Sequence, residues 1–219
     1  RDYHVRVKGN GATDMERKFS ADWKEDTGEK MPVHESLPAI GNVKYQYLFS
    51  DGKGLWEKYG ALIKQAKTSL IIATPYFVPS KEMIKALKDA LNRGVNVKIL
   101  VPFKSDAVLL KQAAYPYLKD MLHAGAEIYQ YQNGFFHGKV TIIDGEIVDI
   151  GTANFDNRSF YLNTESNCII YDKEVTADVW NRLKEDFHKS KRFSQEDFEK
   201  ISKWDWFLAR IANVIAAYL

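Results

Sequence analysis

The strongest constraint on the fold of this chain is a regular alternation of strand-like and helix-like segments from Val43 onward. Short apolar runs alternate with longer segments whose apolar residues recur every three or four positions. The expected strands are 43–49, 69–74, 95–101, 127–132 and 165–171, with a further pair around the Asp144-Gly145 turn. The expected helices are 54–67, 80–92, 106–124 and 174–190. This order predicts an α/β fold with a mixed, largely parallel sheet and helices on both faces.

The residues before Val43 follow a different pattern. Residues 3–8 alternate like a strand, and residues 12–26 predict a helix with Met15, Phe19 and Trp23 on one face. Glycine and proline interrupt the stretch that follows. We therefore expect 1–30 to be the tail of a preceding domain, 31–42 a linker, 43–192 the main domain, and 193–219 a C-terminal amphipathic helix.

The C-terminal segment is predicted to be helical from Phe198 to Leu219 and to have one apolar side. That side is formed by Phe207, Ile211, Val214, Ile215 and Tyr218, with Trp204 at its start. The segment is too short to span a bilayer. Two interpretations remain open, because such a helix either packs on its own domain or lies on a membrane surface or partner.

Composition excludes several classes of protein. The 219 residues include 31 Lys and Arg against 29 Asp and Glu, so the net charge is only +2 and no nucleic-acid partner is expected. Cys168 is the single cysteine, which excludes an intrachain disulfide and predicts a buried strand thiol. No apolar run is long enough to cross a bilayer, and we expect any membrane anchor upstream of Arg1.

The segment around His137 carries the most specific chemistry. His137 and Lys139 are two residues apart, so in an extended chain their side chains point to the same side. A neutral imidazole can attack phosphorus, and a neighbouring ammonium can stabilise the charge that develops on the phosphoryl oxygens. A histidine and lysine at this spacing are common by chance, but Asp144, Gly151-Thr152 and Asn154 follow at fixed intervals.

The complete pattern, His-x-Lys-x4-Asp-x6-Gly-Thr-x-Asn, resembles the defining motif of the phospholipase D superfamily at every specified position. Three further segments are similar to the second half of bacterial cardiolipin synthases: 74–79 (TPYFVP), 129–137 (YQYQNGFFH) and 151–160 (GTANFDNRSF). Residues 162–167 also fit, and the resemblance covers the whole chain. It implies the phospholipase D-like fold, as one repeat of a two-repeat enzyme.

The resemblance implies a role for each matching residue. His137 would be the nucleophile or the acid and base that serves it, while Lys139 and Asn154 would hold phosphate. Glu165 matches a carboxylate that accepts a hydrogen bond from the far imidazole nitrogen and orients the ring. Asp144 lies in an Asp-Gly turn, so we expect it to support the motif by binding turn amides or a basic side chain.

Four further residues are expected to bind substrate. Tyr76 and Phe77 follow a strand, where ligand sites of α/β sheets collect, and they either line a lipid entrance or cap the core. Thr152 and Ser159 are expected to contribute hydroxyl groups to the pocket. No metal or other cofactor is expected, because Lys139 and Asn154 would supply the charge stabilisation.

Superfamily members build one site from two such motifs, but this chain has one. His4 is followed two residues later by Arg6, and His34, His123 and His188 have no lysine at that distance. The second motif would come from a first half of the parent protein, which we favour, or from a second copy of this chain.

The resemblance therefore implies a phosphatidyltransferase that makes cardiolipin and glycerol from two phosphatidylglycerol molecules through a phosphatidyl-histidine. Its expected partners are phosphatidylglycerol and other anionic phospholipids, the membrane surface and the missing first half. The expected location is the cytoplasmic side of the bacterial cell membrane. The alternatives are a phospholipase D-type hydrolase, a nuclease, or a non-catalytic membrane-surface module.

Overall fold

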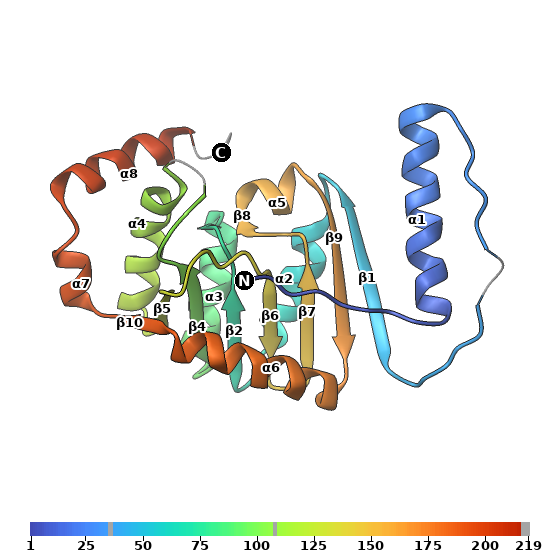
Figure 1. Cartoon of the computed structure of the whole chain (residues 1–219). Coiled ribbons are helices and arrows are strands. Elements are labelled where there is room, and N and C mark those ends of the chain that lie inside the picture. The colour runs from blue at the N-terminus through green and yellow to red at the C-terminus, as the bar shows by residue number, and fades with distance from the viewer. Residues whose placement is uncertain (35–36, 107–108, 216–219) are drawn as a thin grey trace. The chain divides into compact units, whose positions relative to one another are not determined.

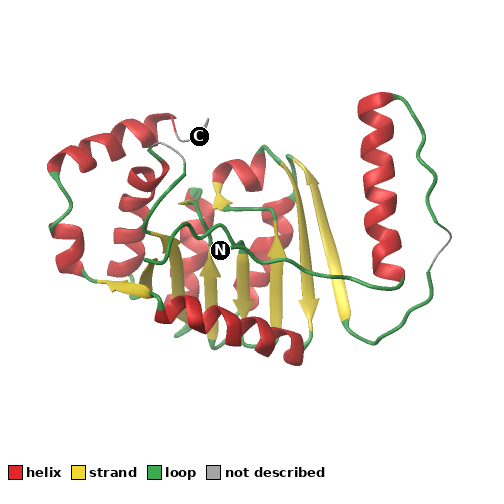
Figure 2. Ribbon diagram, viewed as in Figure 1, coloured by secondary structure: helices red, strands yellow, loops and turns green. Residues whose placement is uncertain are grey.

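The chain divides into two compact units in the computed structural model, which describes residues 1–34, 37–106 and 109–215 (Figures 1 and 2). The larger unit combines Arg1–His4 with Tyr45–Leu219, and the smaller one is Val5–Lys44. The first four residues thus belong with the larger unit, although the sequence pattern placed them in the tail of a preceding domain.

The smaller unit contains the expected helix, α1 (Asn10–Thr27). It ends at Gly28, whose positive φ of 78° lets its N–H donate to the carbonyl of Lys24. Met15, Phe19 and Trp23 lie on one face as predicted, and all three are exposed. The strand expected over 3–8 was wrong, because these residues take no part in a ladder in the described structure.

The larger unit is built on a twisted sheet with the strand order β1-β9-β7-β6-β2-β4-β5-β10. The strands are β1 (Lys44–Asp51), β2 (Ser69–Ala73), β4 (Asn96–Pro102), β5 (Glu127–Tyr131), β6 (Val140–Ile143), β7 (Ile147–Gly151), β9 (Thr164–Tyr171) and β10 (Ser190–Phe193). A separate parallel pair joins β3 (Phe77–Val78) to β8 (Phe155–Asp156). The α/β class is confirmed.

The sheet is mixed, as expected, but less parallel than expected. Strands β2, β4 and β5 run parallel to one another. Strand β6 runs antiparallel to β2, β7 to β6, β9 to β7, and β10 to β5. The tight turn between β6 and β7 reverses the chain, because Asp144 and Gly145 both have positive φ, 54° and 68°.

Helices cover both faces of the sheet (Figure 1). One face carries α2 (Leu55–Gln65), α3 (Lys81–Asn92) and α4 (Leu110–His123), and the other carries α6 (Lys173–His188). Helix α3 begins where predicted, since the Ser80 hydroxyl accepts a hydrogen bond from Met83 N at 3.2 Å. The short helix α5 (Asn157–Tyr161) follows β8.

The C-terminal segment is two helices, and the expected continuous helix from Phe198 was wrong. Helix α7 (Gln195–Glu199) ends before α8 (Lys203–Ile215) begins. The break arises because the Ser202 hydroxyl accepts a hydrogen bond from Asp205 N at 3.0 Å and starts a new helix. The side chain of Ile215 and all of Tyr218 lie outside the described residues.

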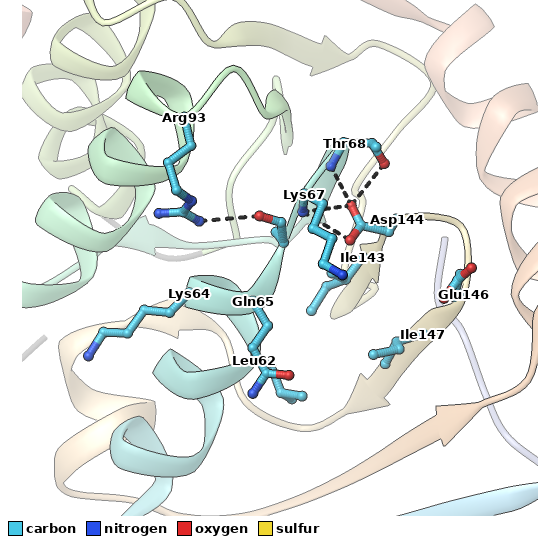
Figure 3. Close-up of a pocket in the computed structure, with 11 residues that line it drawn as sticks. Leu62, Lys64, Gln65, Lys67, Thr68, Arg93, Ile143, Asp144, Glu146 and Ile147 are labelled. Atoms are coloured by element: carbon cyan, nitrogen blue, oxygen red, sulfur yellow. Dashed lines mark hydrogen bonds between the residues drawn. The ribbon is translucent and has the colours of Figure 1, made fainter.

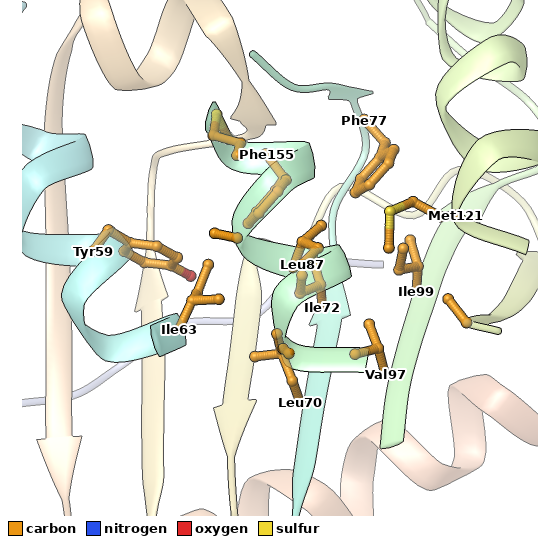
Figure 4. Close-up of a cluster of buried hydrophobic side chains, with 14 of the residues drawn as sticks. Tyr59, Ile63, Leu70, Ile72, Phe77, Leu87, Val97, Ile99, Met121 and Phe155 are labelled. Carbon is orange, nitrogen blue, oxygen red and sulfur yellow. The ribbon is translucent and has the colours of Figure 1, made fainter. Parts of the chain in front are cut away.

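The main core lies between the sheet and the three helices α2, α3 and α4 (Figure 4). Alternate residues of β2 and β4 point into it, including Leu70, Ile72 and Ile99. Phe77 of β3 stacks on Phe155 of β8 with a centroid distance of 5.5 Å. Cys168 is a buried free thiol, as expected, and burial raises its pKa to about 11.

A buried carboxyl group lies inside the sheet at Asp149 of β7. The Asn167 side chain donates a hydrogen bond to Asp149 Oδ2 at 2.7 Å, and Oδ1 has no partner among the described residues. Burial raises the pKa of Asp149 to about 7, although Asn167 and the nearby Tyr59 hydroxyl favour the charged form. Ionising this group therefore destabilises the folded state.

We expect Asp149→Asn to remove one component of the pH dependence of stability. The pKa of Asp149 in the folded state lies above its unfolded value of 3.8. Its contribution to the free energy of unfolding is therefore complete below about pH 4. It is lost as the pH rises through about 7. At pH 8 the variant should be more stable by on the order of 2–4 kcal/mol, measured by denaturant unfolding across that range.

The matched control is Asp89→Asn, which changes an exposed carboxylate on α3 that pairs with Lys85. It should leave the pH profile unchanged. An unaltered profile in Asp149→Asn as well would contradict the assignment.

Candidate active site

The functional residues gather at one edge of the sheet because β6 runs against β2. The register pairs Ala73 at the end of β2 with Val140 at the start of β6, and Val140 in turn with Ile150 near the end of β7. Gly151 at the end of β7 faces Asn167 near the start of β9. The segments that meet at this edge therefore contain Thr74, Lys139, Thr152, Asn154 and Glu165.

His137 and Lys139 lie in the extended segment just before β6, and their side chains meet as predicted. Lys139 Nζ lies 2.7 Å from Nε2 and 3.0 Å from Nδ1 of His137, and it donates to the His137 carbonyl at 2.8 Å. The His137 side chain is 43 % exposed. It is thus partly held by the protein and still open to a substrate.

Gly138, between them, is a position of close approach. A Cβ atom there would lie 2.7 Å from the Tyr3 ring and 3.1 Å from the Phe136 ring. Larger residues would push the two functional side chains away from their positions, which explains the glycine in physical terms.

The N-terminal residues supply a contact to His137 that the sequence did not reveal. Asp2 Oδ2 lies 3.2 Å from His137 Nδ1. The backbone N–H of His137 donates to the Arg1 carbonyl at 2.8 Å, and the backbone nitrogen of Arg1 lies 2.7 Å from the Phe135 carbonyl oxygen. The backbone of Arg1 is therefore paired with residues 135–137, which holds the adjacent Asp2 beside the imidazole.

Two side-chain contacts to α6 fasten this N-terminal segment further. Arg1 Nε donates to Asp186 Oδ2 at 3.0 Å, and the Tyr3 hydroxyl donates to the same oxygen at 2.5 Å. Asp186 is almost completely buried. A buried carboxylate with a cationic and a hydroxyl partner is well compensated, so this anchor holds Asp2 in place.

Lys139 lies in an electrostatically unusual position. Burial lowers its pKa below the ordinary value. Four carboxylates act in the opposite direction: those of Asp2, Glu165, Asp106 and Asp156. An ammonium that has already lost part of its hydration binds a phosphate oxygen at a lower desolvation cost.

The resemblance implied that Glu165 accepts a hydrogen bond from His137. In the described structure Glu165 has other partners. Its carboxylate accepts hydrogen bonds from Thr152 Oγ1 and, at 3.3 Å, from Asn163 Nδ2. Among the described residues the imidazole instead contacts Lys139 and Asp2. The carboxylate beside this ring is supplied by a different part of the chain.

Asn154 and Ser159 form a supporting turn after β7. Asn154 N donates to Ser159 Oγ at 3.0 Å, and Ser159 is completely buried. Ser159 therefore positions the Asn154 backbone, and a substrate contact through its buried hydroxyl stays a prediction. The side-chain oxygen of Asn154 is buried with no partner among the described residues, and the expected contact with a phosphate oxygen would use the Nδ2 donor instead.

Thr152 is exposed at the same edge. Its hydroxyl donates to Glu165 and accepts a hydrogen bond from Ser166 N at 2.9 Å. Both hydrogen bonds of this hydroxyl are to residues of the same chain. A contact between Thr152 and the substrate therefore stays a prediction.

Tyr76 and Phe77 differ although they are adjacent. The Tyr76 hydroxyl donates to Asp106 Oδ1 at 2.6 Å, and burial and this carboxylate raise the pKa of Tyr76. Its half-buried ring lies near the site edge. Phe77 points into the core, completely buried, because successive side chains of an extended segment alternate in direction. Phe77 is thus a core residue, and a contact of Phe77 with lipid stays a prediction.

Asp144 lies at the opposite edge of the sheet from His137, because the two residues flank opposite ends of β6. Its carboxylate bonds backbone amides, which agrees with the supporting role expected of it (Figure 3). Oδ1 accepts hydrogen bonds from the backbone N–H groups of Thr68 at 2.8 Å and Ser69 at 3.0 Å, and Oδ2 from that of Lys67 at 3.0 Å. Burial alone would raise the pKa of Asp144, but these bonds outweigh it and lower the pKa. Asp144 thereby ties the β6–β7 turn to the start of β2.

The turn also borders a surface hollow of about 670 Å³. Lys64, Lys67 and Arg93 contribute cationic groups to it, and Asp144 and Glu146 contribute carboxylates (Figure 3). The Arg93 guanidinium is engaged with the carbonyls of Ile63 and Ala66. The hollow is separate from the His137 edge.

We expect Asp144→Ala to destabilise the larger unit by about 2–4 kcal/mol, because three backbone N–H groups lose a charged acceptor. Denaturant unfolding at neutral pH measures the loss. Glu146→Ala is the matched control: it changes a carboxylate of the same turn that bonds only the exposed Lys173. Equal stability of the two variants would show that the amide contacts of Asp144 contribute nothing.

Comparison with known proteins identifies the family. Residues 59–187 match the family model described as cardiolipin synthase, PLD-like domain. The minor cardiolipin synthase ClsB of Bacillus subtilis (strain 168) is 42% identical over 201 residues, which are 91% of this chain and 50% of that protein. The major cardiolipin synthase ClsA of the same organism is 36% identical over 228 residues, 100% of this chain and 47% of that protein. The chain thus spans about half the length of the curated relatives it matches.

Solved structures share the fold. Phosphatidylserine synthase of Haemophilus influenzae Rd KW20 superposes with a TM-score of 0.65 at 16% identity, covering 92% of this chain and 51% of that one. The phospholipase D family member Nuc of Salmonella typhimurium gives a TM-score of 0.60 at 23% identity, covering 70% of this chain and 100% of that one. The matched residues 59–187 include His137, Lys139, Asn154 and Glu165, and the chain belongs to the cardiolipin synthase family of phospholipase D-like domains.

Proposed function

We propose that this chain is the catalytic second half of a phosphatidyltransferase that joins two phosphatidylglycerol molecules into cardiolipin and releases glycerol. The observation that carries the proposal is the triad of Asp2, His137 and Lys139 at one sheet edge. The similarity to two cardiolipin synthases over nearly the whole chain supports the choice of substrate.

The arrangement of the imidazole suits nucleophilic attack on phosphorus. Asp2 beside Nδ1 favours the tautomer that carries its proton on Nδ1, which leaves the lone pair on Nε2. Nε2 attacks the phosphorus of one phosphatidylglycerol, the bond to the glycerol oxygen breaks, and glycerol leaves after taking up a proton. In the second step a hydroxyl of another phosphatidylglycerol attacks phosphorus, loses its proton, and the P–N bond breaks.

Lys139 and Asn154 stabilise the negative charge that spreads over the non-bridging oxygens in both transition states. Lys139 directly precedes β6 and Asn154 follows β7, and these two strands are antiparallel. Both residues therefore lie at the same end of the strand pair, where we propose that one phosphate meets both. No metal or other cofactor has a role in this scheme, and its charge stabilisation comes from these side chains and their counterparts.

Proton transfer requires a second histidine at the same phosphate. We propose that a first half of the parent protein supplies it, within a second motif, because the curated relatives are about twice as long as this chain. His137 is then the nucleophile or the acid and base opposite it. Glu165 makes no hydrogen bond to His137 among the described residues, and Thr152 and Asn163 fix its position. Its carboxylate could therefore orient the imidazole of the second histidine.

We place the enzyme at the cytoplasmic side of the bacterial cell membrane, where both substrates reside. In the described part of the chain, no helix combines the length and apolarity that a membrane crossing needs. Contact with the membrane through these residues would therefore be made at its surface.

The proposed transfer is tested by incubating this chain with phosphatidylglycerol vesicles, with and without the first half of the parent protein. Mass spectrometry of the lipids should show cardiolipin only with both halves present. His137→Ala should abolish it, and Lys139→Ala should reduce it by at least about 10²-fold, since it removes charge stabilisation in the transition state.

The controls separate the alternatives. Phosphatidic acid in place of cardiolipin would identify a hydrolase. Absence of any lipid product from both halves together would contradict the transferase and leave a nuclease or a non-catalytic module. Glu146→Ala, remote from the site edge, should transfer normally.

We further expect Asp2, and not Glu165, to set the tautomer of His137. In this chain alone, the imidazole ¹⁵N shifts of His137 should change in Asp2→Asn and stay unchanged in Glu165→Gln. Asp2→Glu should restore part of the original spectrum, because it keeps the carboxylate. The opposite pattern would return the orienting role to Glu165.

A further inference from the structure

Helix α8 has two different sides. Its packing side carries small residues, since Ala209 and Ala212 are completely buried. Asn213 Nδ2 donates to the carbonyl of Ala113 on α4 at 3.1 Å. Trp206 lies against Tyr115 of α4 with a centroid distance of 6.2 Å. This side alone attaches α8 to the rest of the larger unit.

The opposite side of α8 exposes large apolar residues. Their exposed fractions are 65% for Trp204, 50% for Phe207, 41% for Ile211 and 81% for Val214. The intervals of three, four and three residues place all four on one stripe of the helix. The domain thus packs α8 through Ala209, Ala212 and the partly buried Trp206, and it leaves four other large apolar residues in solvent.

The charges on the exposed side are all positive. Between Lys203 and Val214, the exposed residues are the four apolar ones together with Lys203 and Arg210. The one acid of the helix, Asp205, is half-buried and accepts hydrogen bonds from Ser202 Oγ at 2.6 Å and Gln112 Nε2 at 3.3 Å. From Lys203 to Val214, no exposed acidic residue therefore weakens the attraction of this side to a negative surface.

Helix α8 is also adjacent to the site edge. Ala212 packs with Leu110 and Ala113 of α4 and with Val78 of β3, and Tyr76 packs against the same cluster. The Tyr76 hydroxyl donates a hydrogen bond to Asp106, and the Asp106 carboxylate is one of those whose charge raises the pKa of Lys139. Figure 1 shows α8 at the same end of the sheet as β8 and α5.

We propose that α8 lies on the surface of an anionic phospholipid bilayer, with Trp204, Phe207, Ile211 and Val214 at the acyl boundary and Lys203 and Arg210 at the headgroups. The choice of occupant rests on the proposed phosphatidylglycerol substrate and on charge complementarity. Large apolar and aromatic residues flanked by cations are the composition of helices that bind in the plane of such an interface. The docked helix brings the His137 edge to the depth of the lipid phosphates.

The test is co-sedimentation of this chain with vesicles of phosphatidylglycerol and phosphatidylcholine in equal parts. Replacing Trp204, Phe207 and Ile211 together with serine should weaken binding at least about tenfold, because the buried apolar area is lost. Lys203→Gln with Arg210→Gln should weaken it by about 25-fold, at roughly fivefold for each charge. Binding to pure phosphatidylcholine should be weak for all forms.

The matched control removes a similar stripe from α1. Serine at Met15, Phe19 and Trp23 takes away three exposed apolar residues from a helix that also exposes Glu25 and Asp26. This variant should bind vesicles like the unaltered chain. Equal loss in both triple variants would show unspecific adhesion and overturn the proposal, and circular dichroism verifies that each variant is folded.

Two further outcomes would overturn it. Vesicle binding that survives the α8 substitutions would place the lipid contact elsewhere. A dimer that these substitutions dissociate, seen by analytical ultracentrifugation in the absence of vesicle binding, would assign the stripe to a second copy. His137→Ala should bind vesicles normally, so failure of docking and failure of the proposed transfer are distinguishable.

Discussion

The site depends on the antiparallel insertion of β6 between the parallel strands and β7. Were β6 parallel to β2, its amino end and the preceding His137 would lie at the opposite edge of the sheet. The observed direction brings the His137 segment to the edge where β2, β4 and β7 end and β9 begins. Asp144 secures this arrangement from the far side by accepting hydrogen bonds from the amides that precede and begin β2.

Electrostatics at the edge follow from this convergence. Carboxylates from separate segments, Asp2, Asp106, Asp156 and Glu165, act on the single half-buried ammonium of Lys139. Such a cluster has more negative than positive groups, which would repel a phosphate. The cations of a second motif would correct this balance, in accord with a composite site.

The sequence predicted the elements better than their assembly. The caps at Ser80 and the turn at Asp144-Gly145 are local signals, and both were confirmed. The strand expected over 3–8 was wrong, because a short alternating segment becomes a strand only if a partner edge is available along its length. The prediction of a single C-terminal helix was wrong. The apolar periodicity continues across the break, but the Ser202 hydroxyl caps a new helix there.

The site shows the same division. Spacing alone predicted that His137 and Lys139 meet, since residues two apart in an extended chain share a side. The burial of Phe77 and Ser159 and the contact of Asp2 with His137 depend on residues far away in the chain, and no local pattern encodes them. The sequence by itself determined the motif, the α/β class and the positions of most helices and strands, because these follow from short-range periodicity and residue chemistry. Only the tertiary structure decided which carboxylate meets the imidazole and which side of α8 faces solvent, because both result from packing between segments distant in sequence.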